Sequence, residues 1–234
     1  MLAAVLDLVL PASCVGCGSK GASWCAGCRV ALMGAPARRR PVPVLAGLPD
    51  CWSAAPYEGV VRTAIVAYKE RGAVALAGVL ADAVVSAAVA AVVADAHAAA
   101  YVGGRFAVVP VPSGGRRVRT RGHDPVGRLA VMVTRRLRGL GLDAVLWPAL
   151  RQVRGVADQA GLSSAERVAN LAGSLQVRHA VKVPPAPVVL LLDDIVTTGA
   201  TLAEAAEVLR ATGAAVPLAV TVAATRRRSA KTLR

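Results

Sequence analysis

The chain has 234 residues, a formal net charge of +14, and 55% hydrophobic residues of which few are aromatic. This length predicts one full domain plus a smaller module, and the composition excludes a disordered chain. The charge favours polyanionic or phosphorylated ligands without deciding between them. The longest charge-free run of the Ala/Val-rich region, residues 83–94, is shorter than the roughly 20 residues of a membrane-spanning helix. We therefore expect a buried helix there and no transmembrane segment.

Residues 1–10 are apolar and resemble a signal peptide only superficially. They lack a basic n-region, and Asp7 interrupts the apolar stretch. We expect a short amphipathic helix packed on the protein, and a cytoplasmic location.

Two C-x-x-C pairs follow, formed by Cys14 with Cys17 and by Cys25 with Cys28. Two knuckles with this spacing can arrange four thiolates around one Zn²⁺. Two disulfides or a redox C-x-x-C pair are the alternatives, and a chain with cytosolic character disfavours disulfides. We predict a structural zinc site made of these four residues, with Cys51 outside it.

The chain then divides by composition. We predict an N-terminal helix and zinc-binding module over residues 1–35, a Pro/Arg-rich linker over 36–50, an α/β domain over 51–225 and a basic tail over 226–234. In the domain, apolar runs alternate with amphipathic patterns, which indicates a parallel sheet flanked by helices. Predicted strands are 106–109, 188–192 and 216–222, and the longest predicted helix is 73–99.

Three further helices are predicted from capping signals. Asp124 and Pro125 form an N-cap and first-turn pair before an apolar stripe. Ser163 with Glu166, and Thr201 with Glu204, are candidate capping boxes, and Gly213 is expected to end the last helix.

The most informative segment is residues 189–201, VLLLDDIVTTGAT. A buried strand ends in Asp193 and Asp194, and a short Thr/Gly loop leads into a helix. Backbone N–H groups and the positive end of the helix would converge on one point, which suits a phosphate. The carboxylates would repel a phosphate, so we expect them to accept hydrogen bonds from sugar hydroxyls.

These thirteen residues resemble, without departure, the signature of type I phosphoribosyltransferases. The resemblance implies that fold, preceded here by the zinc module, and binding of phosphoribosyl pyrophosphate (PRPP). It assigns the ribose hydroxyls to the catalytic pair Asp193 and Asp194. It assigns the 5-phosphate to the loop, made of Thr197, Thr198, Gly199, Ala200 and Thr201.

Nearly the full length is similar to the ComF (competence protein F) family, which joins a four-cysteine zinc module to a phosphoribosyltransferase-like domain. The similarity is carried by Tyr68-Lys69 with Gly72, Val109-Pro-Val-Pro112, Arg119-Thr-Arg121-Gly122, Gln159 with Leu162, Arg167 and Asn170. It implies that the pyrophosphate, carrying Mg²⁺, binds near Ser113, Gly114, Gly115, Arg116, Arg121 and Lys69. The family's aromatic, Asn and Gln after Arg121-Gly122 are here His123, Asp124 and Pro125.

Two functions follow from the resemblance. The first is transfer of a phosphoribosyl group from PRPP to an unknown acceptor. The second is a non-catalytic role in DNA uptake, through binding of single-stranded DNA or DNA-processing proteins. For the second, the basic cluster Arg135, Arg136 and Arg138 is the candidate surface, although a solvated helix end explains it equally well.

Overall fold

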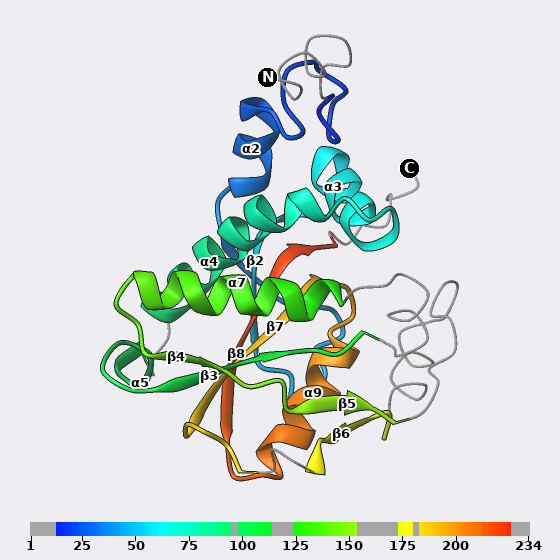
Figure 1. Ribbon diagram of the computed structural model, residues 1–234. Coiled ribbons are helices and arrows are strands. Elements are labelled where there is room, and N and C mark those ends of the chain that lie inside the picture. The colour runs from blue at the N-terminus through cyan, green and yellow to red at the C-terminus, as the bar shows by residue number, and fades with distance from the viewer. Residues whose placement is uncertain (1–12, 95–97, 114–123, 154–172, 180–182, 226–234) are drawn as a thin grey trace, which may run out of the picture.

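A six-stranded, mostly parallel sheet forms the centre of the protein (Figure 1). The computed structural model describes residues 13–94, 98–113, 124–153, 173–179 and 183–225. The strands, in their order across the sheet, are β1 Ala37–Arg39, β2 Asp50–Pro56, β8 Ala215–Ala224, β7 Val188–Val196, β3 Phe106–Pro110 and β4 Ala144–Leu146. β1 is antiparallel to β2, and all the other neighbouring strands are parallel. The sequence-based prediction of an α/β protein with a mainly parallel sheet is confirmed.

Helices cover both faces of this sheet. They are α2 Ala26–Met33, α3 Gly59–Glu70, the short 3₁₀ turn η1 Val74–Leu76, α4 Ala77–Ala94, α5 Ala98–Val102, α7 Pro125–Gly139 and α9 Ala200–Arg210. A two-stranded antiparallel ribbon, β5 Leu150–Gln152 and β6 Leu175–Val177, lies on the α9 side. The arrangement has three layers, with α4 and α7 in front of the sheet in Figure 1.

The central strands are buried on both sides, so their apolar residues alternate between two cores. Along β7, Leu190 and Leu192 join the core beneath α3, α4 and α7, whereas Val189 and Leu191 join the core beneath α9. This is why the sequence shows a continuous apolar run here rather than an alternating one. The two cores make the sheet a rigid support for the loops at its edge.

The predicted helices and strands are largely confirmed. Asp124 caps α7 by accepting a hydrogen bond from Gly127 N at 3.1 Å. All three predicted strands form, each longer than predicted. The predicted helix over 73–99 is divided among η1, α4 and α5, with residues 95–97 outside the described part. The capping box of Ser163 and Glu166 also lies outside the described residues, as do residues 1–12 and 226–234.

One helical segment, Val74–Ala94, is long and apolar enough by composition to cross a membrane. In the folded protein 61% of its most apolar window is buried. Its small side chains, such as Ala83, Ala87 and Ala91, pack against the sheet and α7. Apolar composition is thus explained by the core that this helix helps to form, which agrees with the buried helix expected from the sequence.

The parallel strands end at one edge of the sheet, and they end unevenly. Pro56 of β2 and Val196 of β7 both pair with Ala224, the last residue of β8. β3 stops earlier, because its last residue Pro110 pairs with Leu192. Beyond Leu192, β7 therefore has a strand partner on the β8 side only. Open α/β sheets bind ligands at this edge.

Candidate functional site

The acidic pair lies within the last part of β7. We expected the strand to end before Asp193, but it continues to Val196 because β8 extends alongside it, with Asp193 opposite Thr221. The neighbouring β3 has already ended, so the β3 side of both acids faces the loop that follows Pro110. Both acids therefore lie in regular strand backbone, where β7 is paired with β8 on one side and has no strand partner on the other.

Lys69 contacts this pair from a segment that is far away in the sequence. It belongs to the last turn of α3, and its Nζ lies 2.7 Å from Oδ2 of Asp194. Asp194 is only 5% exposed, so its charge needs such a partner, because an unpaired buried carboxylate is strongly destabilising. Tyr68, the preceding residue, anchors the helix end by donating from its hydroxyl to the Pro125 carbonyl at 2.9 Å. Burial raises the pKa of this tyrosine to about 12, so it stays neutral.

Asp193 and Asp194 influence each other. Burial, followed by the charge of Asp194, raises the pKa of Asp193 well above the ordinary carboxyl range, while Lys69 opposes the shift. One oxygen of Asp193 also accepts a hydrogen bond from the Asp194 N–H at 2.8 Å. Two carboxyl groups thus share one nearby lysine. This carboxyl pair can accept hydrogen bonds from hydroxyl donors, and a further positive charge nearby would stabilise its ionised form.

The loop after β7 is short and sharply bent. Gly199 has φ +78°, which favours glycine, and it occupies the N-cap position of α9. A Cβ at this position would lie 2.9 Å from Leu48 Cδ1 and 3.3 Å from Pro41 Cγ. The loop is therefore backed by the chain that precedes β2. Gly199 is needed both for its backbone conformation and for this close packing.

Thr201 has a different role from the one predicted. We expected it to cap the last helix, but α9 already begins at Ala200 and ends at Arg210, with Ala211 rather than Gly213 as its C-cap. The glycine N-cap offers no side chain, and Thr198 accepts only a weak bond from Ala200 N at 3.4 Å. The first-turn N–H groups of an α-helix have no partner within the helix, so those after Ala200 suit an anion.

Other predicted site residues are only partly described. Ser113 lies half-buried in the loop that follows β3, on the same edge as the acidic pair. Gly114, Gly115, Arg116 and Arg121 lie outside the described residues, together with the motif positions from Gln159 to Asn170. Asp124 is accounted for as the cap of α7.

Sequence reasoning missed a small pocket beside the loop, with a volume of about 100 Å³. Its lining residues are Arg39, Arg40, Pro41, Val196, Thr197, Ala224 and Thr225. The Arg triplet at 38–40 was the available signal, but we interpreted that segment as a linker. The contacts of Arg39 and Arg40 depend on the antiparallel pairing of β1 with β2, which the sequence pattern does not reveal.

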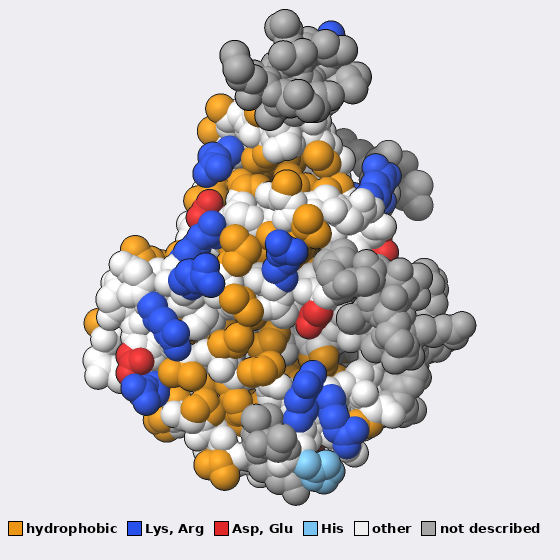
Figure 2. All heavy atoms as spheres, viewed as in Figure 1, with side chains coloured by type: hydrophobic (Ala, Val, Ile, Leu, Met, Phe, Trp, Pro, Cys, Tyr) orange, Lys and Arg blue, Asp and Glu red, His pale blue; other side chains and the backbone are white. Residues whose placement is uncertain are grey.

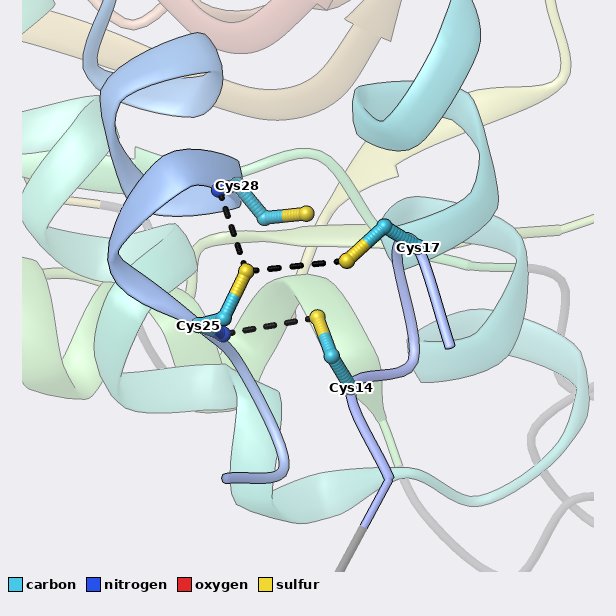
Figure 3. A group of neighbouring side chains, drawn as sticks. All are labelled: Cys14, Cys17, Cys25 and Cys28. Atoms are coloured by element: carbon cyan, nitrogen blue, oxygen red, sulfur yellow. Dashed lines mark hydrogen bonds between the residues drawn. The ribbon is translucent and has the colours of Figure 1, made fainter. Parts of the chain in front are cut away.

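The four predicted metal ligands meet in the N-terminal module (Figure 3). Their sulfurs all lie within 4.8 Å of one another, and the Cys17 and Cys25 sulfurs are 3.6 Å apart. Sulfurs bound at about 2.3 Å to one tetrahedral zinc ion lie about 3.8 Å apart. A disulfide needs about 2.05 Å, and all four thiols are free. The cluster is compatible with a metal such as zinc, and Cys51 is buried elsewhere, in β2.

The surroundings of the cysteines favour thiolates at some positions. Burial alone would raise the pKa of Cys14, but N–H donors from Cys25, Cys17 and Gly16 lower it to about 6. The pKa of Cys25 is also lowered, chiefly by the N–H of Cys28. Burial and the neighbouring sulfurs raise the pKa of Cys28. Four thiolates this close together require a cation between them, which is the chemistry of a four-cysteine metal site.

The module is part of the folded body rather than an appendage. α2 begins directly after Cys25 and packs against α3, α4 and β2. Gly16 is required for this packing, since a Cβ there would lie 2.8 Å from both the Cys28 sulfur and the Trp24 ring. Val15 and Trp24 also rest on the core beneath α3 and α4.

The predicted arginine cluster at the end of α7 is mainly structural. Arg136 donates to the Gly78 carbonyl at 2.7 Å and lies 3.3 Å from Asp82, and Arg138 donates to the Ala144 carbonyl at 2.6 Å. Arg135 is exposed. Figure 2 shows the blue basic side chains of this face in separate groups, with red acidic ones among them.

No protein-family model matches the chain, and no curated protein gives a significant match.

Proposed function

We propose that this protein binds PRPP and transfers its phosphoribosyl group to an acceptor molecule. The observation that carries the proposal is the meeting of Lys69 with the Asp193–Asp194 pair, directly before a glycine-capped helix, at the carboxyl edge of a parallel sheet. The resemblance of residues 189–201 to type I phosphoribosyltransferases adds support, and with it the assignment of that specific fold.

The proposed roles follow from the contacts. The carboxyl pair accepts hydrogen bonds from the ribose hydroxyls, and Lys69 holds the Asp194 carboxylate in position through their ion pair. The loop from Thr197 to Thr201 offers backbone N–H groups and hydroxyls to the 5-phosphate. Mg²⁺ enters on the pyrophosphate of PRPP rather than as a resident ion.

The reaction breaks the bond from ribose C1 to pyrophosphate, which leaves with the bonding electrons. A lone pair of the acceptor forms the new bond to C1, and the acceptor's proton passes to solvent or to the leaving group. Positive charge develops on the ribose ring, so carboxylates that hold the ring can stabilise this state. Catalysis would consist mainly of positioning and charge stabilisation.

The cysteine cluster is proposed to hold one structural Zn²⁺. Four sulfur ligands leave no open position for a substrate, which distinguishes structural from catalytic zinc sites. The metal would fix the start of α2 and, through it, the packing of α3, whose end carries Lys69.

Calorimetric titration of the full chain with PRPP and Mg²⁺ tests the proposal. We expect saturable binding that Asp194→Asn weakens roughly 10- to 100-fold, because a charge-assisted hydrogen bond is lost. Asp143→Asn is the matched control, since Asp143 is a half-exposed carboxylate paired with Arg105 away from the site. Absence of saturable binding by the wild-type chain would contradict the proposal. A screen of nucleobases and amines for pyrophosphate release then identifies the acceptor.

Binding of single-stranded DNA, or of DNA-processing proteins, is the second candidate. It is favoured by Arg128 and Arg135, two exposed arginines that lie on the same side of α7 because they are seven residues apart. Arg136 and Arg138 are unsuitable for a test, since their replacement would disturb the fold. We expect salt-dependent DNA binding that Arg128→Gln with Arg135→Gln weakens. Equal binding by this variant and by Arg62→Gln on α3 would argue against the surface.

A further inference from the structure

We propose that the pocket beside the loop, lined by Arg39, Arg40, Thr197 and Thr225, is the subsite for the acceptor, and that the acceptor carries a small oxyanion such as a carboxylate or phosphate. This inference rests on the proposed function and names the chemical class of its second substrate.

The first argument is charge. Two arginines and two threonines are among the residues that line a space of about 100 Å³, which suits one oxyanion group and little more. The Nε of Arg39 is buried and has no hydrogen-bond partner among the residues that the structure describes. A guanidinium group binds an oxyanion through charge-assisted, often bidentate, hydrogen bonds. Arg40 is exposed, so its guanidinium is free to close over such a group.

The second argument is position. Thr197 is the only member of the loop from Thr197 to Thr201 that lines the pocket. The other loop residues proposed to hold the donor phosphate, from Thr198 to Thr201, do not line it. The pocket also extends to the ends of β7 and β8, through Val196 and Ala224. It is therefore adjacent to the proposed donor site, with Thr197 common to both, and two substrates of a transfer reaction need to be adjacent in this way.

The third argument is that the backbone of Arg39 is held in place. β1 pairs with β2, so Arg39 lies opposite Cys51 in the sheet. The following chain rests on the loop through Pro41 and Leu48. An arginine whose backbone is fixed in a sheet loses less entropy on binding than one in a freely moving segment.

The experiment titrates the full chain with inorganic phosphate and, separately, with benzoate, each with and without saturating PRPP and Mg²⁺. We expect at least one anion to bind in the presence of PRPP, and Arg40→Gln to weaken it about tenfold. Arg39→Gln should do the same, and Arg39→Lys should restore part of the affinity. Preference for phosphate or benzoate identifies the anion class. Arg38→Gln is the matched control, because Arg38 is in the same strand and pairs with Asp50 outside the pocket.

Three results would overturn this assignment: no binding of either anion, anion binding unchanged in both Arg39→Gln and Arg40→Gln, or displacement of the anion by PRPP. Displacement would mean that the pocket holds the donor's own phosphate. Because the anion is also titrated without PRPP, the pocket is tested even if PRPP itself fails to bind. Exposed Arg40 keeps the test informative if the Arg39 variants do not fold.

Discussion

The cysteine cluster and the sheet edge are both built from a handful of polar side chains, but they are assembled differently. The four cysteines lie within fifteen consecutive residues, from Cys14 to Cys28, and their spacing alone brings the sulfurs together. The sheet edge takes Arg39 from β1, Lys69 from α3 and Asp194 from β7. A local site depends on the turns of one short segment, whereas a composite site depends on the whole fold.

The largest expected effect comes from removing the metal. Cys14→Ser should abolish the one zinc ion expected per chain and lower the thermal midpoint, because structural zinc supplies much of the folding energy of such modules. Metal analysis and thermal denaturation, with and without a chelator, measure this. Cys51→Ser is the control and should keep the metal, since Cys51 lies in β2. An unchanged melting curve after complete metal removal would show that the module is independent of the sheet.

A smaller effect is expected at the loop. Gly199→Ala should destabilise the protein by about 2 kcal/mol or more, because the φ of +78° is strained for alanine and the new methyl meets Leu48. Gly213→Ala is the matched control: its φ is +88°, yet a Cβ there meets nothing within 4 Å, so about 1 kcal/mol is expected. Urea unfolding measures both. If Leu48→Ala does not relieve part of the Gly199→Ala cost, the contact with the preceding chain is unimportant.

The last effect concerns pH. The pKa of Asp193 is raised in the folded state, so the folded protein binds this proton more tightly than the unfolded chain does. Stability from this group is full below the ordinary carboxyl pKa of about 4 and is lost as pH rises through the raised value. The loss is at most about 1.4 kcal/mol per pH unit.

Urea unfolding at about pH 5 and about pH 8 compares the wild type with Asp193→Asn. The variant should lose less stability over this interval than the wild type. Asp143→Asn, which removes a half-exposed carboxylate elsewhere, should keep the wild-type dependence. If the free energy of unfolding depended on pH equally in the wild type and in Asp193→Asn, the raised pKa of Asp193 would be contradicted.

The same difference between local and composite sites explains what the sequence could predict. Spacing and capping are local, so the cysteine cluster, the Asp124 cap and the three strands were predicted correctly. The end of β7 was not, because it depends on how far β8 continues beside it. Thr201 was misassigned because Gly199 can end the loop earlier without a capping side chain. The pairing of Lys69 with Asp194, and the pocket at Arg39, require knowing which distant segments become neighbours.

The strand β1 has a consequence for solubility. It covers the outer edge of β2, whose backbone would otherwise offer unpaired N–H and C=O groups to another chain. A fragment that starts at residue 51, where the α/β pattern begins, would expose that edge and remove the side chains behind Gly199. Such a fragment should self-associate, however complete its proposed PRPP loop. Edge protection and the loop's support thus come from the same short stretch of chain, residues 37–48.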